Sequence, residues 1–558
     1  MTIKLTQGVE WGGKPYAQGE SIPGLTDAQE TALVGEGRAI WMSTPTAVGG
    51  RVSVEADSSG VVGGAQIALM QPARRIGVVG HSIPAQSFNY ANSGYGGLAG
   101  DKGYSSYGFV SFGLYLSGYL GPVNAYAVAG STTAVLVDQV RSAIAAGCDL
   151  IVMHNGGVND AALSASESIG NLTAAVRAVT AAGVKLLIAT EVSTEIFGSS
   201  AARINTINAF IRSLQRAAPL QIHVMDFAAI TSSPHASDGG SFTSILDDLT
   251  YDTTHPNQMA AYLMGKEMVR AAGAWLAGDP HQTINGANYL ANGRCGGSSG
   301  TVTSGAANSA APDSWISDRH GAASVNFASY VARDIAIRWP RPLTSGSAAN
   351  AIPIGLRVRP TIRDGFHYVA LTAGSVAWAN AAEPSGAAPW TTVSTSGITW
   401  LVVPENDRNT LPGRNGQTVI ADFTTDTAGA SDYWRMYQEV DVANIADTTA
   451  LQGVMRVVPM DGYLGGACLR LSFLNSGGSI IGNTWGMAPQ ILSSSSGYPY
   501  YAPWSRDGGL VVTPPMDAPA GTAKVRFSVQ MFGMGSDAAA PTKCRVGVTD
   551  CVLRNGEI

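Results

Sequence analysis

Four short segments of the sequence carry residue types that could together cleave an ester. Ser82 lies in the segment GHSI, just after the apolar run 76–79, and Asp252 and His255 open and close the segment DTTH. A serine hydroxyl is a poor nucleophile at neutral pH and needs an adjacent base. A histidine base in turn needs a carboxylate to fix its tautomer and support the imidazolium. We therefore interpret Ser82, His255 and Asp252 as a candidate catalytic triad.

The other two segments could stabilise the negative charge that develops as an ester is cleaved. Gly130 ends a run that we expect to form a strand, and a glycine lets its backbone N–H approach a ligand closely. Asn159, in the segment GGVND after the apolar run 150–153, can direct its side-chain amide at an oxyanion, and Asp160 can cap the following helix. Each segment taken alone also fits an ordinary structural turn. The order of all four along the chain favours catalysis.

From residue 74 to about 278 the sequence alternates between apolar runs and helical patterns. This alternation predicts an α/β domain with a parallel sheet covered on both faces. The carboxyl ends of parallel strands meet at one edge of such a sheet, where open α/β folds bind their ligands, so the four segments should meet there. We expect strands at 76–79, 150–153, 185–190 and 222–227, and helices at 166–182, 202–217 and 256–277.

With these segments, residues 74–278 resemble the SGNH (GDSL-like) hydrolases, whose four blocks contribute a Ser, a Gly, an Asn and an Asp-x-x-His pair. The resemblance implies a flavodoxin-like sheet, esterase or acetylesterase activity, and no metal or other cofactor. It implies Ser82 as nucleophile and His255 as general base oriented by Asp252. It also implies an oxyanion hole formed by the backbone N–H groups of Ser82 and Gly130 and by the Asn159 side chain.

The chain departs from this family at His81, because the first block usually has Asp before the serine. The departure puts the local support of the turn, and with it the pH profile, in question. His81 and His154 both lie at expected strand ends, a placement that a metal site could also use. The sequence offers no third ligand at a spacing typical of such a site. We therefore expect no metal, and we expect His154 to be a packed residue or one that supports the catalytic residues.

Composition and charge exclude several other classes of protein. The net charge is −6 and no basic run is present, which argues against nucleic-acid binding. The five cysteines are scattered without metal-ligand spacing, so we expect them to be buried apolar side chains. The first residues do not match a secretory signal. The most apolar segment, 107–123, is interrupted by glycines and is shorter than the roughly 20 residues that cross a bilayer, so we expect a buried helix and no membrane insertion.

The length of 558 residues predicts two to four domains. After residue 280 the sequence changes to short alternating runs separated by Gly, Pro and Asp, which is typical of an all-β sandwich. We expect a small N-terminal module at 1–45, a linker at 46–73, the hydrolase domain at 74–280, and the sandwich at 281–558 with a module inserted at about 352–403.

The sandwich resembles the galactose-binding-like jelly rolls that accompany carbohydrate enzymes, and residues 1–45 and 368–403 resemble modules of bacteriophage virion and tail proteins. These resemblances imply a tail spike or tail fibre that removes acetyl groups from a bacterial surface polysaccharide and is located in the virion with other tail proteins. Weak binding of sugar at single sites would favour a multivalent homotrimer. Aromatic side chains that could stack on sugar rings, or instead fold onto the sandwich, are Trp485, Tyr498, Tyr500, Tyr501 and Trp504.

Three other functions remain open at the level of sequence. One is a secreted or cell-surface bacterial carbohydrate acetylesterase that uses the sandwich as an accessory binding module. Another is a non-catalytic adhesin on a hydrolase scaffold, against which every chemically required residue is present. The third is a lipase or thioesterase, which would need a larger apolar acyl pocket than the sequence indicates. The sequence identifies neither the polysaccharide nor the acyl position.

Overall fold

In the computed structural model the chain forms two compact units. Unit 1 contains residues 1–85, 123–255 and 267–277, and unit 2 contains residues 86–122, 256–266 and 278–558. The structure describes residues 2–5, 9–11, 14–16, 39–42, 71–88, 101–192, 201–231, 249, 254–276, 288–293, 295, 299–303, 311–320, 324–331, 337–338, 350–352, 356–360, 364–376, 384–385, 388, 391–404, 417–424, 433–462, 466–488, 508–532 and 543–556.

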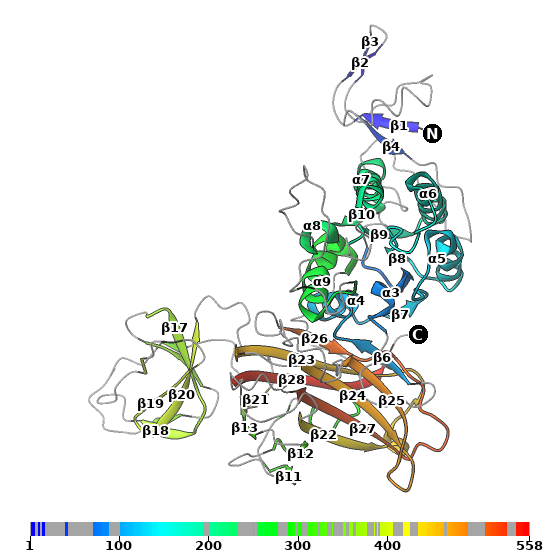
Figure 1. Ribbon diagram of the computed structural model, residues 1–558. Coiled ribbons are helices and arrows are strands. Elements are labelled where there is room, and N and C mark those ends of the chain that lie inside the picture. The colour runs from blue at the N-terminus through cyan, green and yellow to red at the C-terminus, as the bar shows by residue number, and fades with distance from the viewer. Residues whose placement is uncertain are drawn as a thin grey trace. The chain divides into compact units, whose positions relative to one another are not determined.

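Unit 1 is built on a five-stranded sheet in which every neighbouring pair of strands is parallel (Figure 1). The order β10-β9-β8-β5-β7 is the 2-1-3-4-5 order of flavodoxin-like folds, counted from β5 as the first strand. The predicted parallel α/β sheet is confirmed, and the observed strands follow the predicted ranges closely. The strands are β5 Ile76–Gly80, β7 Val123–Ala125, β8 Leu150–His154, β9 Lys185–Ala189 and β10 Ile222–Met225.

Helices α5, α6 and α7 lie on one face of this sheet, and their apolar side chains form one core cluster with those of the strands. On β10, Ile222 and Val224 belong to this cluster, so His223 points to the opposite face, where its ring stacks on Trp275. The helices are α3 Ser82–Ala85, α5 Leu136–Ala145, α6 Ala165–Ala181, α7 Ala201–Ala217, α8 Phe227–Thr231 and α9 Gln258–Ala272, with 3₁₀ turns η2 Thr133–Val135 and η5 Gly273–Leu276.

Helix α6 begins at a capping box. Ser164 Oγ accepts a hydrogen bond from the Glu167 backbone N–H at 3.2 Å, and the Glu167 carboxylate accepts one from the Ser164 N–H at 2.8 Å. The prediction that Asp160 caps this helix is wrong. Its buried carboxylate instead accepts from the backbone N–H and hydroxyl of Thr133 and from the Ser168 hydroxyl. Asp160 thus ties the loop after β8 to the segment before α5.

The strand order reverses between β5 and β8, because the chain passes from β5 to β7 on one side and then returns to β8 on the other. In open α/β sheets the crevice at such a reversal is the usual ligand site. Gly80 and His154 end the two strands and are paired across this point. The segment that carries Ser82 therefore lies where this fold class binds its ligands.

Unit 2 contains two larger sheets, and apolar side chains from both meet in one core cluster. Residues such as Leu469 and Phe527 come from the first sheet, and Met455 and Val548 come from the second. The first sheet has the order β11 Thr301–Val302, β12 Ile316–His320, β22 Tyr433–Asp441, β27 Lys524–Phe532, β24 Gly466–Leu474, β25 Ile480–Ala488 and β6 Lys102–Ser105. The second has the order β13 Ser324–Val331, β21 Gln417–Thr424, β28 Lys543–Asn555, β23 Leu451–Gly462 and β26 Gly509–Val512.

The segment 86–122 belongs by its contacts to unit 2, although the sequence places it in the middle of the predicted hydrolase domain. Strand β6 pairs in parallel with β25, and the Asp101 carboxylate accepts hydrogen bonds from the backbone and side-chain amides of Asn483. Helix α4, Phe109–Ser117, places Phe112 and Tyr115 in the core of this unit. It is the buried helix expected within 107–123.

Smaller sheets account for the remaining strands. Five lie in the order β14-β16-β17-β20-β19 beside the pair β15-β18, with Tyr368 and Trp400 in a separate core. They fall in sequence between β13 and β21, which pair with each other. The strands are β14 Ile337–Arg338, β15 Asn350–Ile352, β16 Arg357–Arg359, β17 Phe366–Ala370, β18 Gly374–Val376, β19 Thr392–Thr395 and β20 Ile398–Pro404; near the N-terminus, β1 Thr2–Leu5 pairs with β4 Ala39–Met42, and β2 Val9–Trp11 with β3 Lys14–Tyr16. A 3₁₀ turn, η6, spans Val442–Asn444.

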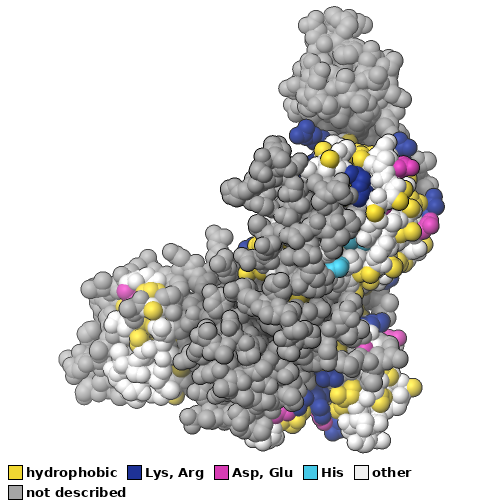
Figure 2. All heavy atoms as spheres, in the orientation of Figure 1, with side chains coloured by type: hydrophobic (Ala, Val, Ile, Leu, Met, Phe, Trp, Pro, Cys, Tyr) yellow, Lys and Arg dark blue, Asp and Glu magenta, His cyan; other side chains and the backbone are white. Residues whose placement is uncertain are grey.

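Charged residues make up only 13% of the sequence. Figure 2 shows the described Lys and Arg side chains of one face in small groups, several of them near Asp or Glu. Two ion pairs in unit 2 join Arg435 to Asp318 and Arg526 to Glu439. Among the described residues, no helix is long and apolar enough to cross a membrane. Four of the described cysteines are buried, as predicted, and form no disulfide: Cys148, Cys295, Cys468 and Cys551.

The two carboxyl-containing links around α6 differ in burial and should differ in their contribution to stability. Asp160→Ala leaves three buried donors without their acceptor and should lower the free energy of unfolding by about 3 kcal/mol. Ser164→Ala removes an exposed cap and should cost about 1 kcal/mol. Denaturant unfolding followed by circular dichroism measures both, and a Ser164→Ala loss equal to or larger than the Asp160→Ala loss would contradict the assignment.

Candidate active site

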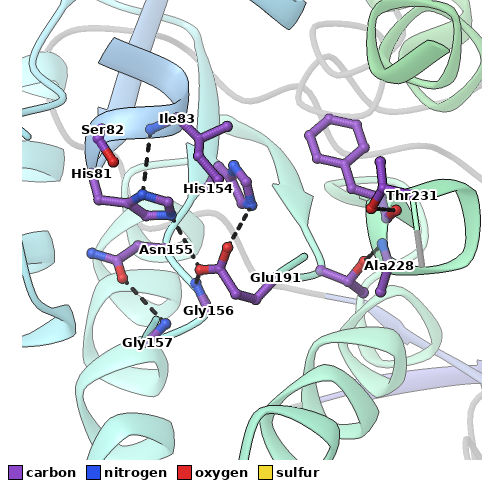
Figure 3. Close-up of polar contacts among 12 residues, drawn as sticks. His81, Ser82, Ile83, His154, Asn155, Gly156, Gly157, Glu191, Ala228 and Thr231 are labelled. Atoms are coloured by element: carbon purple, nitrogen blue, oxygen red, sulfur yellow. Dashed lines mark hydrogen bonds and ion pairs between the residues drawn. The ribbon is translucent and has the colours of Figure 1, made fainter. Parts of the chain in front are cut away.

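Ser82 occupies the turn that leaves β5, the strand that pairs with both β7 and β8. Gly80, the last residue of β5, has φ +134°, and a Cβ atom there would lie 2.1 Å from the carbonyl oxygen of His154. Only glycine can therefore bring the ends of β5 and β8 so close together. Ser82 then begins the short helix α3, so its backbone N–H has no acceptor within that helix. The local sequence thus directs the serine hydroxyl and a backbone donor to the sheet edge (Figure 3).

The structure brings Ser82 and His255 together. His255 Nε2 lies 2.9 Å from Ser82 Oγ, and both residues are partly buried. With the ring proton on Nδ1, Nε2 accepts the serine proton, which is the contact that a serine nucleophile needs for activation. His255 comes three residues before α9. Asp252, the predicted partner of the ring, lies outside the described residues.

The two predicted oxyanion-hole loops are joined to each other. Gly130 follows β7 with φ +77° in the left-handed region, and no atom lies within 4 Å of the position that a Cβ would take there. The Asn159 side-chain amide donates to the Ser131 carbonyl oxygen at 3.0 Å. Because an amide nitrogen carries two hydrogens, Asn159 can hold this loop with one and offer the other to an oxyanion. The observed hydrogen bond of Asn159 therefore leaves one side-chain N–H for the predicted role in an oxyanion hole.

Gln139 on α5 connects the loop after β7 to the turn that carries the nucleophile. Sequence analysis missed this residue. Its side chain accepts from the Gly80 N–H at 2.7 Å and donates back to the Gly80 carbonyl oxygen at 3.1 Å. The amide nitrogen also lies 3.4 Å from Ser131 Oγ. A glutamine on the first turns of a helix carries no distinctive motif, so only the fold reveals this role.

Behind Ser82 lies a fully buried polar cluster that the sequence reveals only in part. His81, His154 and Glu191 have no solvent exposure (Figure 3). Glu191 Oε2 lies 3.1 Å from His81 Nε2, Oε1 lies 3.2 Å from His154 Nε2, and the Gly156 N–H donates to Oε2 at 3.0 Å. Glu191 is thus a third possible metal ligand beside His81 and His154, which the spacing of residues in the sequence does not indicate. The available signal was a carboxylate two residues beyond a buried strand, far from both histidines in sequence.

The three groups could geometrically surround a cation, since one ligand atom from each lies within 4.8 Å of the others. The Ile83 N–H, however, donates to His81 Nδ1 at 3.4 Å. A ring nitrogen that accepts a hydrogen bond carries no proton, so this contact corresponds to the His81 tautomer with its proton on Nε2, which faces Glu191. The observed contacts are therefore those of a hydrogen-bonded cluster in which a proton lies between His81 and Glu191.

Burial and charge act in opposite directions on this cluster. Burial by itself raises the pKa of the Glu191 carboxyl, but the charges and hydrogen bonds of His81 and His154 outweigh it and hold that pKa well below its usual range. Burial lowers the pKa of His154, and Glu191 offsets this only in part. The net effect on Glu191 favours its ionised form.

The predicted sugar-stacking residues are not supported where the structure describes them. Trp485 lies on β25 with only 2% of its surface exposed, and the Arg470 guanidinium lies over its ring at 4.2 Å from the centroid. A covered ring offers no face to a sugar, so we correct this assignment to a structural cation–π contact. The other four lie outside the described residues: Tyr498, Tyr500, Tyr501 and Trp504.

Comparison with known proteins gives weak similarities only. No family model matches the sequence, and no curated protein matches it. Among solved structures, similarity extends to a putative acylhydrolase from Bacteroides fragilis, with 18% identity and a TM-score of 0.28 over 40% of this chain and 100% of that one. A GDSL-like lipase from Bacteroides thetaiotaomicron gives 16% identity and a TM-score of 0.27 over 37% and 92%. A variant of an acetyl-xylooligosaccharide esterase from Geobacillus gives 14% identity and a TM-score of 0.26 over 37% of this chain and 96% of that one. At these identities and TM-scores none of the three structures assigns an activity to this chain.

Asn159→Ala tests whether the loop after β8 supplies an oxyanion donor. Loss of one such donor should lower kcat for a short aryl acetate by about 10²–10³. Asn171→Ala is a suitable control, because Asn171 on α6 also donates from its side chain, but to the Thr133 hydroxyl of η2. A change in kcat of less than a few-fold for Asn159→Ala would contradict the role.

The buried His154 predicts how stability depends on pH. Because its folded-state pKa is lowered, the unfolded chain, with a pKa of about 6.5, binds the proton more readily. Stability is therefore complete above about pH 6.5 and falls as the pH drops below that value. The thermal midpoint should decrease from about pH 7 to pH 5.5, and less steeply in His154→Gln; equal slopes would show that His154 does not titrate in this way.

Proposed function

We propose that this chain is a serine esterase of the SGNH type. The observation that carries the proposal is the 2.9 Å contact between His255 Nε2 and Ser82 Oγ at the strand reversal between β5 and β8. A nucleophile and its base lie there within hydrogen-bonding distance, at the place where open α/β folds act on their ligands. The order of the four sequence segments gives independent support.

In the proposed acylation step, Ser82 Oγ attacks the carbonyl carbon of the ester while His255 Nε2 takes the hydroxyl proton. The carbonyl oxygen becomes an oxyanion and is stabilised by the N–H groups of Ser82 and Gly130 and by the Asn159 amide. When the tetrahedral intermediate collapses, the alcohol leaves and takes the proton from His255. We assign Asp252 the task of orienting the ring and supporting its positive charge.

Deacylation repeats the same sequence with water. His255 removes a proton from the water as its oxygen attacks the acyl carbon on Ser82, and the same donors stabilise the second oxyanion. The carboxylic acid then leaves, and His255 returns the proton to Ser82 Oγ. Within each half-reaction Nε2 holds the transferred proton between attack and collapse, so the chain's own residues complete the cycle.

For the substrate, we propose an O-acetyl group of a bacterial surface polysaccharide, attacked by a phage tail spike or tail fibre. The support is the sequence resemblance of residues 1–45 and 368–403 to phage modules and of the β-rich part to carbohydrate-associated jelly rolls. In this setting the protein would lie in the virion as a homotrimer beside other tail proteins, because several weak sugar sites bind a polymer more firmly together.

Ser82→Ala tests the esterase proposal. It should lower the hydrolysis of a short aryl acetate by about 10⁴-fold or more, because the variant lacks the nucleophile, and it should leave the far-ultraviolet circular dichroism unchanged. Ser213→Ala, which alters an exposed hydroxyl on α7, is the matched control and should keep full activity. Retained turnover in Ser82→Ala would refute the assignment.

The finer proposal is tested by acetate release from a panel of acetylated bacterial polysaccharides, with the Ser82→Ala variant as the blank. At least one polymer should release acetate in a Ser82-dependent way. Hydrolysis of the aryl acetate without release from any polymer would leave the esterase standing and contradict the proposed polysaccharide substrate.

A further inference from the structure

The residue before the nucleophile makes two hydrogen bonds that fix the turn around Ser82. His81 Nδ1 accepts from the Ile83 N–H at 3.4 Å, and Nε2 faces Glu191 Oε2 at 3.1 Å. His81 and Ile83 flank Ser82 in sequence, so one buried ring holds the backbone on both sides of the nucleophile. Rotation of this ring would break its hydrogen bond to the Ile83 N–H and so remove this support of the turn that carries Ser82.

Glu191, which holds that ring, is itself held from several directions. Its backbone N–H donates to Asn208 Oδ1 at 2.7 Å, and the Asn208 amide donates back to the Glu191 carbonyl oxygen at 2.9 Å. Its Oε2 also accepts from the Gly156 N–H. A Cβ atom on Gly156 would lie 2.4 Å from Glu191 Cβ, so the backbone of the loop after β8 lies directly against this side chain.

Glu191 therefore contacts both the turn that carries the nucleophile and the loop that carries Asn159, and the proposed reaction depends on the distance between these two. Through His81 it contacts the turn with the nucleophile, and through Gly156 it contacts the loop that continues to Asn159. The His154 ring closes the cluster at 4.9 Å from the His81 ring and packs edge-on against Phe227. Burying a carboxylate costs desolvation free energy, and a buried carboxylate with this many hydrogen-bond partners has a fixed position.

We propose that Glu191 is a positioning residue of the esterase, acting through His81 to set the Ser82 hydroxyl against the oxyanion donors of the loop after β8. The inference rests on the proposed function. It also accounts for His81 at a position where the family that this chain resembles usually has Asp. In this chain a carboxylate is supplied by Glu191, two residues after β9, and His81 connects it by hydrogen bonds to the turn of Ser82.

Glu191→Gln tests the proposal in the full chain with a short aryl acetate. The amide keeps the shape of the side chain but replaces one acceptor oxygen by a donor, so the turn should shift. Because a displacement of about 1 Å at a reacting group can cost about 10² in rate, kcat should fall by about 10- to 100-fold while KM stays within about twofold. Glu167→Gln, the same change at the exposed capping box, should alter neither constant.

Two variants of His81 test the same contact from its other end, which matters if Glu191→Gln fails to fold. His81→Gln keeps an N–H donor in place of Nε2 and should retain kcat within about fivefold. His81→Leu removes the donor and should show the same loss as Glu191→Gln. A purely structural role would lower the thermal midpoint of both variants without this rescue.

Each outcome decides the matter. Wild-type turnover that depends on Ser82, with kcat unchanged in Glu191→Gln or equally reduced in His81→Gln and His81→Leu, would overturn the positioning role and leave the esterase intact. Loss of activity on treatment with a chelator, together with a stoichiometric metal that disappears in Glu191→Gln, would also overturn it, because the cluster would then be a metal site. Wild-type protein without turnover would contradict the esterase and this inference together.

Discussion

The hydrogen bond between Ser82 and His255 joins two side chains that are 173 residues apart in sequence, so it forms only where the fold brings the turn after β5, at one edge of the parallel sheet, to the segment before α9. The tightest constraint on that edge is the approach of β5 to β8. At Gly80 there is no room for a side chain against the His154 carbonyl oxygen. A larger residue would separate the two strand ends and move the serine away from the loops that face it.

Three polar side chains around this edge link its loops to one another. Gln139 joins the turn after β5 to the loop after β7, Asn159 joins the loops after β7 and β8, and Glu191 joins the turn after β5 to the loop after β8. Each link uses either a neutral amide or a carboxylate with several partners, which limits the cost of burying it. A catalytic geometry held in this way needs little rearrangement when charge develops on a substrate.

Much of this arrangement follows from sequence alone. Apolar runs of strand length predicted the sheet, and residues placed just after those runs, Ser82 foremost, were expected at the same edge. Helix positions followed from periodicity. These features are local, because the hydrophobic pattern of a few consecutive residues indicates whether a strand or one face of a helix is buried. The pairing of Ser82 with His255 could be expected because both belong to short segments with recognisable chemistry.

What sequence could not predict depends on contacts between distant residues. Asp160 was assigned to a cap because the sequence shows a polar residue before a helix, whereas Ser164 holds that position and Asp160 binds Thr133 across the loop. Glu191 went unnoticed because it lies 110 residues from His81. Trp485 stayed a candidate for stacking on a sugar, since sequence does not reveal that Arg470 covers its ring.

The most direct test of the Ser82–His255 pair is reaction with a fluorophosphonate, which phosphonylates only an activated serine, followed by peptide mapping by mass spectrometry. The account predicts one adduct, on the peptide that contains Ser82, and its loss when His255 is replaced by alanine. No adduct on the folded protein, or an adduct on a different serine, would contradict it.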